Sequence, residues 1–160
     1  MPTPPPNALS TKIAMAVAAL LSAAPNGTFA NVFSVTRSYA QTDKLTELDG
    51  IKVAVVPATW VPNRQTRANA TTNEYAIDVA VQHYVKNWDD PTLVDPLAFL
   101  FEQLVDYIGS PAHQALITDG SGNPTVGFIK TEIPYLYVPA QLRELSTYTA
   151  VARHTYKGLR

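Results

Sequence analysis

The sequence predicts one domain of the α+β class: a small, mostly antiparallel β-sheet of three or four strands with two helices packed on one face, plus long loops. Three observations lead to this prediction. The length of 160 residues suits one domain, so we expect residues 1–160 to share one core. Apolar residues recur at helical spacing in two segments, 9–24 and 96–108, and strand-like alternation marks the segments 30–40, 51–57, 74–86 and 147–157.

Composition limits the classes of function. The formal net charge is -1, so the chain has no general electrostatic reason to bind nucleic acid, and we expect no specific nucleic-acid binding. The absence of cysteine excludes disulfides, thiolate metal sites and a cysteine nucleophile. Charged residues make up only 16% of the chain, which suits a protein that hides surface against copies or partners.

The N-terminal region combines a proline-rich segment with a helix. Residues 1–8 begin MPTPPPN and predict an extended arm. Residues 9–24 predict an amphipathic helix, although the apolar run after Lys12 also imitates the core of a signal peptide. We favour the helix. The run is too short for a membrane span, which needs roughly 20 residues, and we expect no membrane association.

The next strands differ in the strength of their signal. Residues 51–57 predict a short strand that Pro57 ends, and residues 57–73 show no period and predict a long loop or arm. Residues 74–86 carry the strongest strand signal in the chain. There Tyr75, Ile77, Val79 and Val81 fall on one face, and Ala76, Asp78, Ala80 and Gln82 fall on the other.

The second helix and the C-terminal part follow. Asp95 suits the N-cap, Pro96 suits the first helical position, and Gly109 ends the helix. Residues 115–130 predict a hairpin around the sequence DGSGNP, and residues 132–141 predict an extended segment broken by two prolines. The final strand, 147–157, alternates clearly.

No catalytic constellation is specific. His83, His113 and His154 are scattered and show no metal-ligand spacing. The glycine-rich run at 120–127 lacks the Lys-Ser/Thr of a phosphate loop and suits a hairpin tip. The acidic cluster before the second helix suits capping better than acid–base work. We therefore expect no catalytic, cofactor-binding or metal residue, and no enzyme.

Candidate interface residues come from the aromatic and arginine content. Trp and Arg are enriched among interface hot spots, which favours a partner contact over a solvated loop or a single-stranded nucleic-acid contact for the 57–73 segment. Tyrosines on the strands suit an interface, with filling of the core edge as the alternative; Tyr135 and Tyr137 belong to this set. The predicted interface contains Trp60, Arg64, Arg67, Tyr75, Tyr84, Tyr148 and Tyr156.

The order of elements resembles a known family. A helix containing KIAMAVAALL, a short strand KVAVVP, a long loop, the strand EYAIDVAVQHYV, the helix DPLAFLFEQLVDYI and a last strand STYTAVARHTYK follow one another. This layout resembles the tail terminator and neck proteins of long-tailed bacteriophages, including lambda-like tail terminators. The similarity covers about residues 8–157 and concerns layout and strand character, without a fixed motif. The proline-rich start and the longer, more broken region 115–141 depart from the family pattern.

The resemblance implies a virion protein of the neck or tail, assembled in the host cytoplasm. It implies a homohexameric ring that caps the tail tube, contacts the tail tube protein and the head–tail connector or adaptor proteins, leaves a lumen through which DNA can pass, and uses no cofactor. A head-closure, adaptor or minor tail protein of similar fold is the alternative within this class.

Two other classes remain open from the sequence. The chain is a small exported binding domain if residues 12–24 form a signal peptide. It is a small hydrolase if Asp78, His83 or His154 does chemistry, although strand alternation places Asp78 on the face opposite His83.

Overall fold

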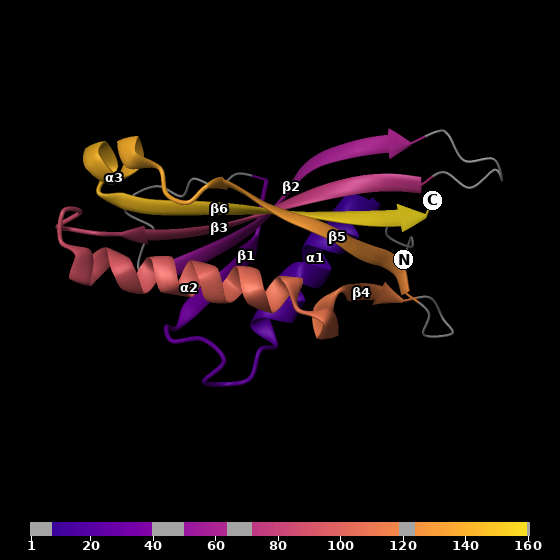
Figure 1. Ribbon diagram of the computed structural model, residues 1–160, viewed down its shortest axis with the longest axis horizontal. Helices are drawn as coiled ribbons and strands as arrows, with labels where there is room; N and C mark the ends of the chain where they lie inside the picture. Colours follow the sequence, from indigo (N-terminus) through magenta and orange to yellow (C-terminus); the bar gives the residue numbers. More distant parts are fainter. Residues whose placement is uncertain (1–7, 40–49, 64–71, 119–123, 160) are drawn as a thin grey trace, which may run out of the picture.

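The computed structural model describes residues 8–39, 50–63, 72–118 and 124–159 (Figure 1). The proline-rich segment of residues 1–7 lies outside this part. The elements are, in chain order, α1 (Leu9–Ser22), β1 (Phe33–Arg37), β2 (Ile51–Asn63), β3 (Thr72–Tyr84), α2 (Pro91–Gly109), a 3₁₀ turn η2 (Pro111–His113), β4 (Ala115–Thr118), β5 (Pro124–Tyr135), α3 (Pro139–Leu145) and β6 (Thr147–Leu159).

The strands form one sheet in the order β1-β2-β3-β6-β5-β4. Strands β1 and β2 are parallel, and every other neighbouring pair is antiparallel. The longest pairing joins β3 to β6, from Thr72 opposite Leu159 to Tyr84 opposite Thr147. The predicted α+β class and mostly antiparallel sheet are therefore confirmed, with more strands than the three or four that the sequence indicates.

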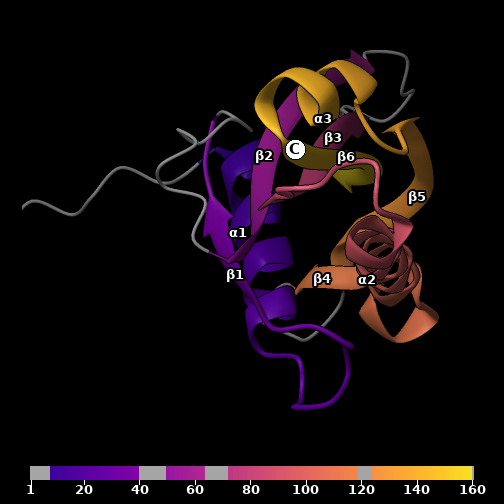
Figure 2. The same cartoon turned by 90° about the vertical axis from the view of Figure 1, so that its left-hand side faces the viewer.

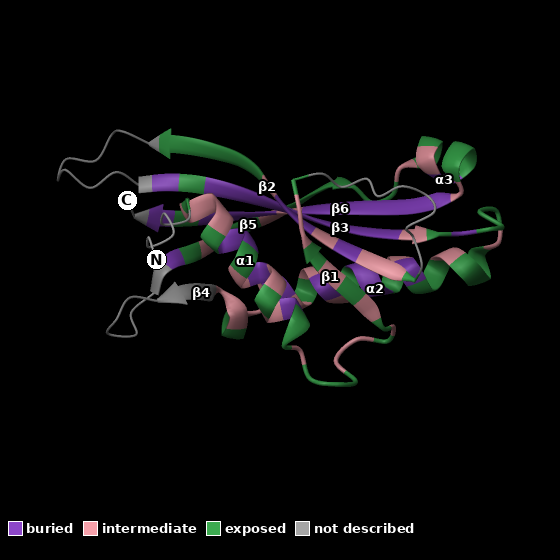
Figure 3. Ribbon diagram, turned by 180° about the vertical axis from the view of Figure 1, so that it is seen from behind, coloured by how far each residue is buried: buried purple, intermediate pink, exposed green. Residues whose placement is uncertain are grey.

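The core lies between the sheet and the two longer helices. Figure 2 shows the sheet curving around α1 and α2, and Figure 3 shows buried residues along much of β3 and β6. The predicted alternation of β3 is confirmed, since its residues Tyr75, Ile77, Val79 and Val81 all join the core. The largest fully buried helical side chains are Ile13 and Val17 of α1 and Leu100, Phe101, Leu104 and Ile108 of α2.

The prediction that Pro57 ends a strand and opens a long loop is wrong. Strand β2 continues through Pro57 to Asn63, with a register shift between Pro57 and Thr59. The reason is the position of the proline: β1 pairs with β2 only as far as Val55, so β2 is an edge strand beyond that residue. A proline is tolerated where its missing N–H faces the open side of a sheet. Residues 64–71, the middle of the expected loop, lie outside the described part.

The predicted cap of the second helix is also wrong. Helix α2 begins at Pro91 with Asp90 as its N-cap, and Pro96 lies inside the helix. The sequence contains the same Asp-Pro pair twice, at 90–91 and at 95–96. Both pairs satisfy the preference for Asp at the N-cap and Pro at the first helical position, and the structure uses the earlier one.

The C-terminal third differs from the prediction in one element. Strands β4 and β5 pair as an antiparallel hairpin, which confirms the predicted hairpin of residues 115–130, although residues 119–123 at its tip lie outside the described part. Beyond it, residues 132–135 are extended as predicted and form the end of β5, whereas the short helix α3 begins at Pro139, within the part expected to be extended. Seven residues are too few for a helical period to be visible in the sequence.

Candidate interaction site

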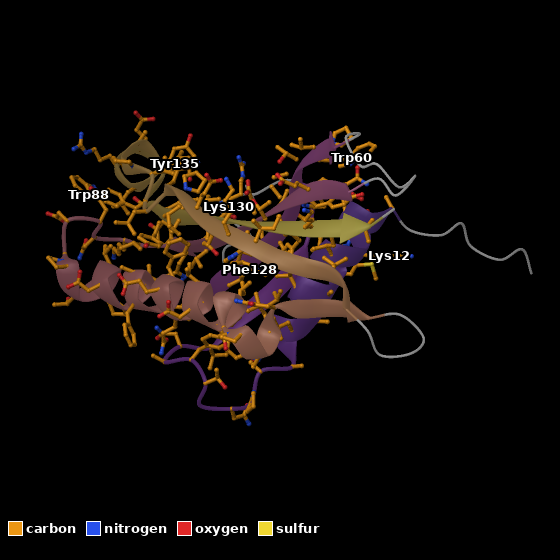
Figure 4. The ribbon with its side chains drawn as sticks, turned by 45° about the vertical axis from the view of Figure 1, so that its right-hand side comes forward. Lys12, Trp60, Trp88, Phe128, Lys130 and Tyr135 are labelled. Atoms are coloured by element: carbon orange, nitrogen blue, oxygen red, sulfur yellow. The ribbon has the colours of Figure 1, made fainter. Side chains whose placement is uncertain are left out.

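Large apolar side chains gather on the surface at the end of the sheet where β3 ends and β6 begins. Figure 4 shows Trp88 and Tyr135 at this end, near α3, and Trp60 well away from them. Exposed apolar clusters on a soluble domain mark interaction sites more often than chance. We call this surface the apolar end, and its exposed members are Tyr84, Trp88, Leu93, Tyr135, Leu136, Tyr137 and Leu145.

The connection from β3 to α2 presents Trp88. The backbone N–H of Asp90 donates to the carbonyl of Asn87 (3.1 Å), which closes a turn around Trp88. The Asp90 carboxylate in turn accepts hydrogen bonds from the Thr92 N–H (2.9 Å) and hydroxyl (2.6 Å). These bonds lower the pKa of Asp90 below its ordinary value, so the carboxylate stays charged at the start of α2. The turn leaves Trp88 41% exposed on a fixed backbone.

The connection from β5 to α3 presents two more large side chains. The Tyr148 hydroxyl donates to the Leu136 carbonyl (3.3 Å), and the Val138 N–H donates to the Thr149 carbonyl (3.0 Å). Burial, helped by the negative charge of Glu102, raises the pKa of Tyr148 to about 12. The hydroxyl is therefore protonated at pH 7 and can donate this hydrogen bond. Residues 136–138 are thus held against β6, while Leu136 and Tyr137 remain 55% and 48% exposed.

The end of α3 is joined to the end of β3. Ser146 has a φ of 48°, in the left-handed region that a short polar residue can adopt after a helix. Its carbonyl accepts a hydrogen bond of 2.7 Å from the N–H of Val85. Leu145 and Tyr84 are thereby brought to the same end of the sheet.

A cavity of about 250 Å³ opens at the apolar end. Typical small-molecule pockets measure roughly 300–1,000 Å³, so this cavity is better matched to a few side chains of another polypeptide. Arg143 is the one lining residue with a charged side chain. The residues that line it are Trp88, Val94, Tyr137, Pro139, Leu142 and Arg143.

The outer face of the sheet carries an ion pair between Arg153 and Asp78. The Arg153 guanidinium donates two hydrogen bonds to the Asp78 carboxylate, at 2.8 and 2.9 Å. This contact raises the pKa of Arg153, and the Asp78 side chain is only 7% exposed. The bidentate pairing ties β3 to β6 on that face.

The residues of the hydrolase hypothesis are not brought together. His154 is fully buried on the helix-covered face, and its Nδ1 lies 2.9 Å from the Thr131 hydroxyl. Burial lowers the pKa of His154 to about 4, against a weaker opposite effect of the Asp78 charge, so the imidazole is neutral at pH 7. The sheet register places His154 opposite Ile77 and His83 opposite Tyr148, six residues further along β3. Within the described ranges, no group of three or more acidic or histidine side chains could hold a metal ion.

The predicted interface residues fall into three groups. Trp60 and Tyr84 are 49% and 46% exposed, as an interface residue must be. Tyr75, Tyr148 and Tyr156 are at most 4% exposed, so these three belong to the core of the chain. For them the interface prediction is wrong, and the alternative, that the tyrosines fill the core, is the better description. Arg64 and Arg67 lie outside the described part.

Trp60 belongs to a separate surface. It stacks on Tyr75 with ring centroids 6.3 Å apart and an interplanar angle of 4°.

Trp88, Leu136 and Leu145 were not identified as interface residues from the sequence. The signal that could have found them is the placement of Trp88 in a turn between a strand and a helix, and the closely spaced apolar residues of the run YLY at 135–137.

No known family model matches the chain, and no curated protein matches it either. In the part of the chain that the structure describes, none of the helices has the length and apolar character that crossing a membrane requires.

Proposed function

We propose that the chain is a self-assembling structural subunit of a bacteriophage neck or tail, and specifically the tail terminator. In this proposal six copies form a ring that caps the tail tube and joins it to the head connector. The ring is part of the virion and is assembled in the host cytoplasm.

The observation that carries the proposal is the apolar end. Seven large apolar side chains there are more than two-fifths exposed, and hydrogen bonds fix the backbone beneath several of them. Aromatic residues held rigidly on a surface suit the core of a protein–protein interface, because little side-chain entropy is lost when they are covered. A contact between this end and a different surface of the next copy is heterologous, and such a contact closes a ring when the rotation allows it.

Two partly open strand edges also favour assembly. Strand β2 is paired with β1 only over residues 51–55, and β5 is paired with β4 only over residues 124–127. The remaining lengths lie at the two sides of the sheet, where a neighbouring copy can cover them. The order of helices and strands supports the more specific part of the proposal, the role at the tail.

The test is tail-tube assembly in vitro. Purified tube protein is polymerised with and without this chain, and tube lengths and ends are recorded by negative-stain electron microscopy. A terminator halts elongation and appears as a cap at one end of the tube. Tubes of unchanged length without caps would contradict the assignment. A matched pair of variants links the effect to the surface: Trp88→Ala should impair capping, whereas Phe99→Ala, which removes an exposed aromatic ring from α2, should not.

A further inference from the structure

The cavity at the apolar end has the chemistry of a site for a proline-rich peptide. Trp88 and Tyr137 line it from two different connections, and Pro139 and Leu142 add apolar surface. Proline-rich segments dock in aromatic-lined grooves because their polyproline II helix is already formed and loses little entropy on binding. The indole N–H, the phenol O–H and the Arg143 guanidinium are all hydrogen-bond donors.

The chain itself contains a segment with the complementary chemistry. Residues 2–6 read PTPPP, and they lie outside the described part. Proline has no N–H, so such a segment presents carbonyl acceptors almost without donors. It carries no charged side chain, and the cavity contains a single one, so docking has no charge conflict.

The segment cannot reach the cavity of its own chain. Leu9, where α1 begins, lies against Gly158 near the end of β6, since a Cβ on that glycine would be 2.9 Å from Leu9 Cδ2. The cavity lies near Thr149, because the lining residues Tyr137 and Pro139 flank Val138, whose N–H donates to the Thr149 carbonyl. The nine residues from Thr149 to Gly158 span roughly 30 Å of strand. Figure 1 shows the start of α1 and the helix α3 at opposite ends of the molecule.

The reach of the segment is shorter than this distance. Pro4 is five residues from Leu9 and Pro2 is seven, so in a polyproline II helix they extend about 16 Å and about 22 Å from it. Even a fully extended chain of seven residues spans only about 25 Å. The cavity can therefore be filled by this segment only from another copy.

We infer that residues 2–6 of one copy dock in the Trp88–Tyr137 cavity of the next copy. The inference rests on the proposed self-assembly and names one of its contacts. The contact joins opposite ends of neighbouring molecules, so it is heterologous and compatible with a ring.

The first test compares full-length variants by light scattering over a concentration series. Replacing Pro4, Pro5 and Pro6 with Ser, or Trp88 with Ala, should raise the concentration of half-assembly at least tenfold. Combining the two changes should add little, because both remove the same contact. Phe99→Ala is the control for loss of an exposed aromatic ring and should stay within about twofold of the wild type. Thermal melts check that the variants fold, as the partial exposure of Trp88 leads us to expect.

The second test separates docking from assembly. The chain has two tryptophans, so Trp60→Phe leaves Trp88 as the fluorescent reporter. A synthetic peptide of residues 1–8 is titrated into the Pro→Ser chain carrying this change. A saturable change in Trp88 fluorescence on addition of the peptide supports the inference if Tyr137→Ala abolishes it.

The outcomes distinguish the inference from the proposed function. No response to the peptide, together with normal assembly of the Pro→Ser variant, would overturn the docking and leave the ring intact. A saturable response in a chain that never self-associates would refute assembly, and would assign the cavity to a proline-rich segment of a different protein. That result would also overturn the inference.

Discussion

Lowering the pH from 7 to 4.5 is expected to destabilise the fold through His154. The imidazole is 0% exposed, and its Nε2 has no hydrogen-bond partner among the described residues. Burial lowers the pKa of His154 from 6.5 to about 4. The unfolded chain therefore binds a proton at this residue below pH 6.5, and the folded chain does not bind it until the pH approaches 4. The stability that the neutral imidazole provides is complete above pH 6.5 and is lost as the pH falls.

The magnitude follows from the size of the shift. Each pH unit between the two pKa values costs about 1.4 kcal/mol of unfolding free energy, so the loss at pH 4.5 is about 3 kcal/mol. The assay is urea denaturation of the wild type and of His154→Gln at several pH values from 7 to 4.5. Glutamine keeps a group that can bond to Thr131 but does not titrate. Carboxylates titrate in both proteins, so the difference between the two curves isolates His154. Parallel curves would refute the reasoning, because they would show that His154 is not held neutral by burial.

Two further predictions concern stability, and each compares a pair of variants. The Tyr148 hydroxyl donates to a backbone carbonyl, whereas the buried Tyr156 hydroxyl has no partner in the described part of the chain. Tyr148→Phe should therefore cost about 1 kcal/mol of unfolding free energy, and Tyr156→Phe should cost less than about 0.5 kcal/mol, both measured by urea denaturation. Arg153→Ala should cost about 2 kcal/mol, since it leaves the Asp78 carboxylate without its bidentate partner. Lys130→Ala is the matched control: its ion pair with Glu132 has both side chains more than half exposed, and its loss should cost less than about 0.5 kcal/mol. Equal losses for Tyr148 and Tyr156, or for Arg153 and Lys130, would contradict the respective arguments.

The elements that the sequence predicts well are those with a strong local period. Strand β3 alternates over the eight residues 75–82, and both long helices show an apolar stripe, so their existence and buried faces follow from the residues alone. The layout of a mostly antiparallel sheet with helices on one face then follows from the need to bury these surfaces together.

The elements that the sequence predicts poorly depend on tertiary context. Pro57 ends a strand only where both edges are paired, and the open edge of β2 cannot be seen locally. The two Asp-Pro pairs are equivalent by propensity, and α2 begins at the first, where the Asp90 carboxylate accepts hydrogen bonds from Thr92. Helix α3 packs against β6, the strand that follows it directly in the chain, and its seven residues are too few to show a helical period.

The candidate site shows the same limit. The sequence identifies tyrosine and tryptophan as the interface types, but it does not say which of them the sheet buries. Tyr148 and Tyr156 lie on the helix-covered face of β6 and are buried, whereas Tyr84 is the last residue of β3 and is exposed. The apolar end forms only when the ends of β3, β5 and β6 are brought together.

Mass in solution tests the central claim, self-assembly into a ring, most directly. We would measure it by light scattering over a concentration series and image the largest species in negative stain. Six chains of 17.4 kDa give a ring of about 104 kDa, and this is the species that the account predicts. A mass of 17.4 kDa at every concentration, with no ring in the images, would contradict it.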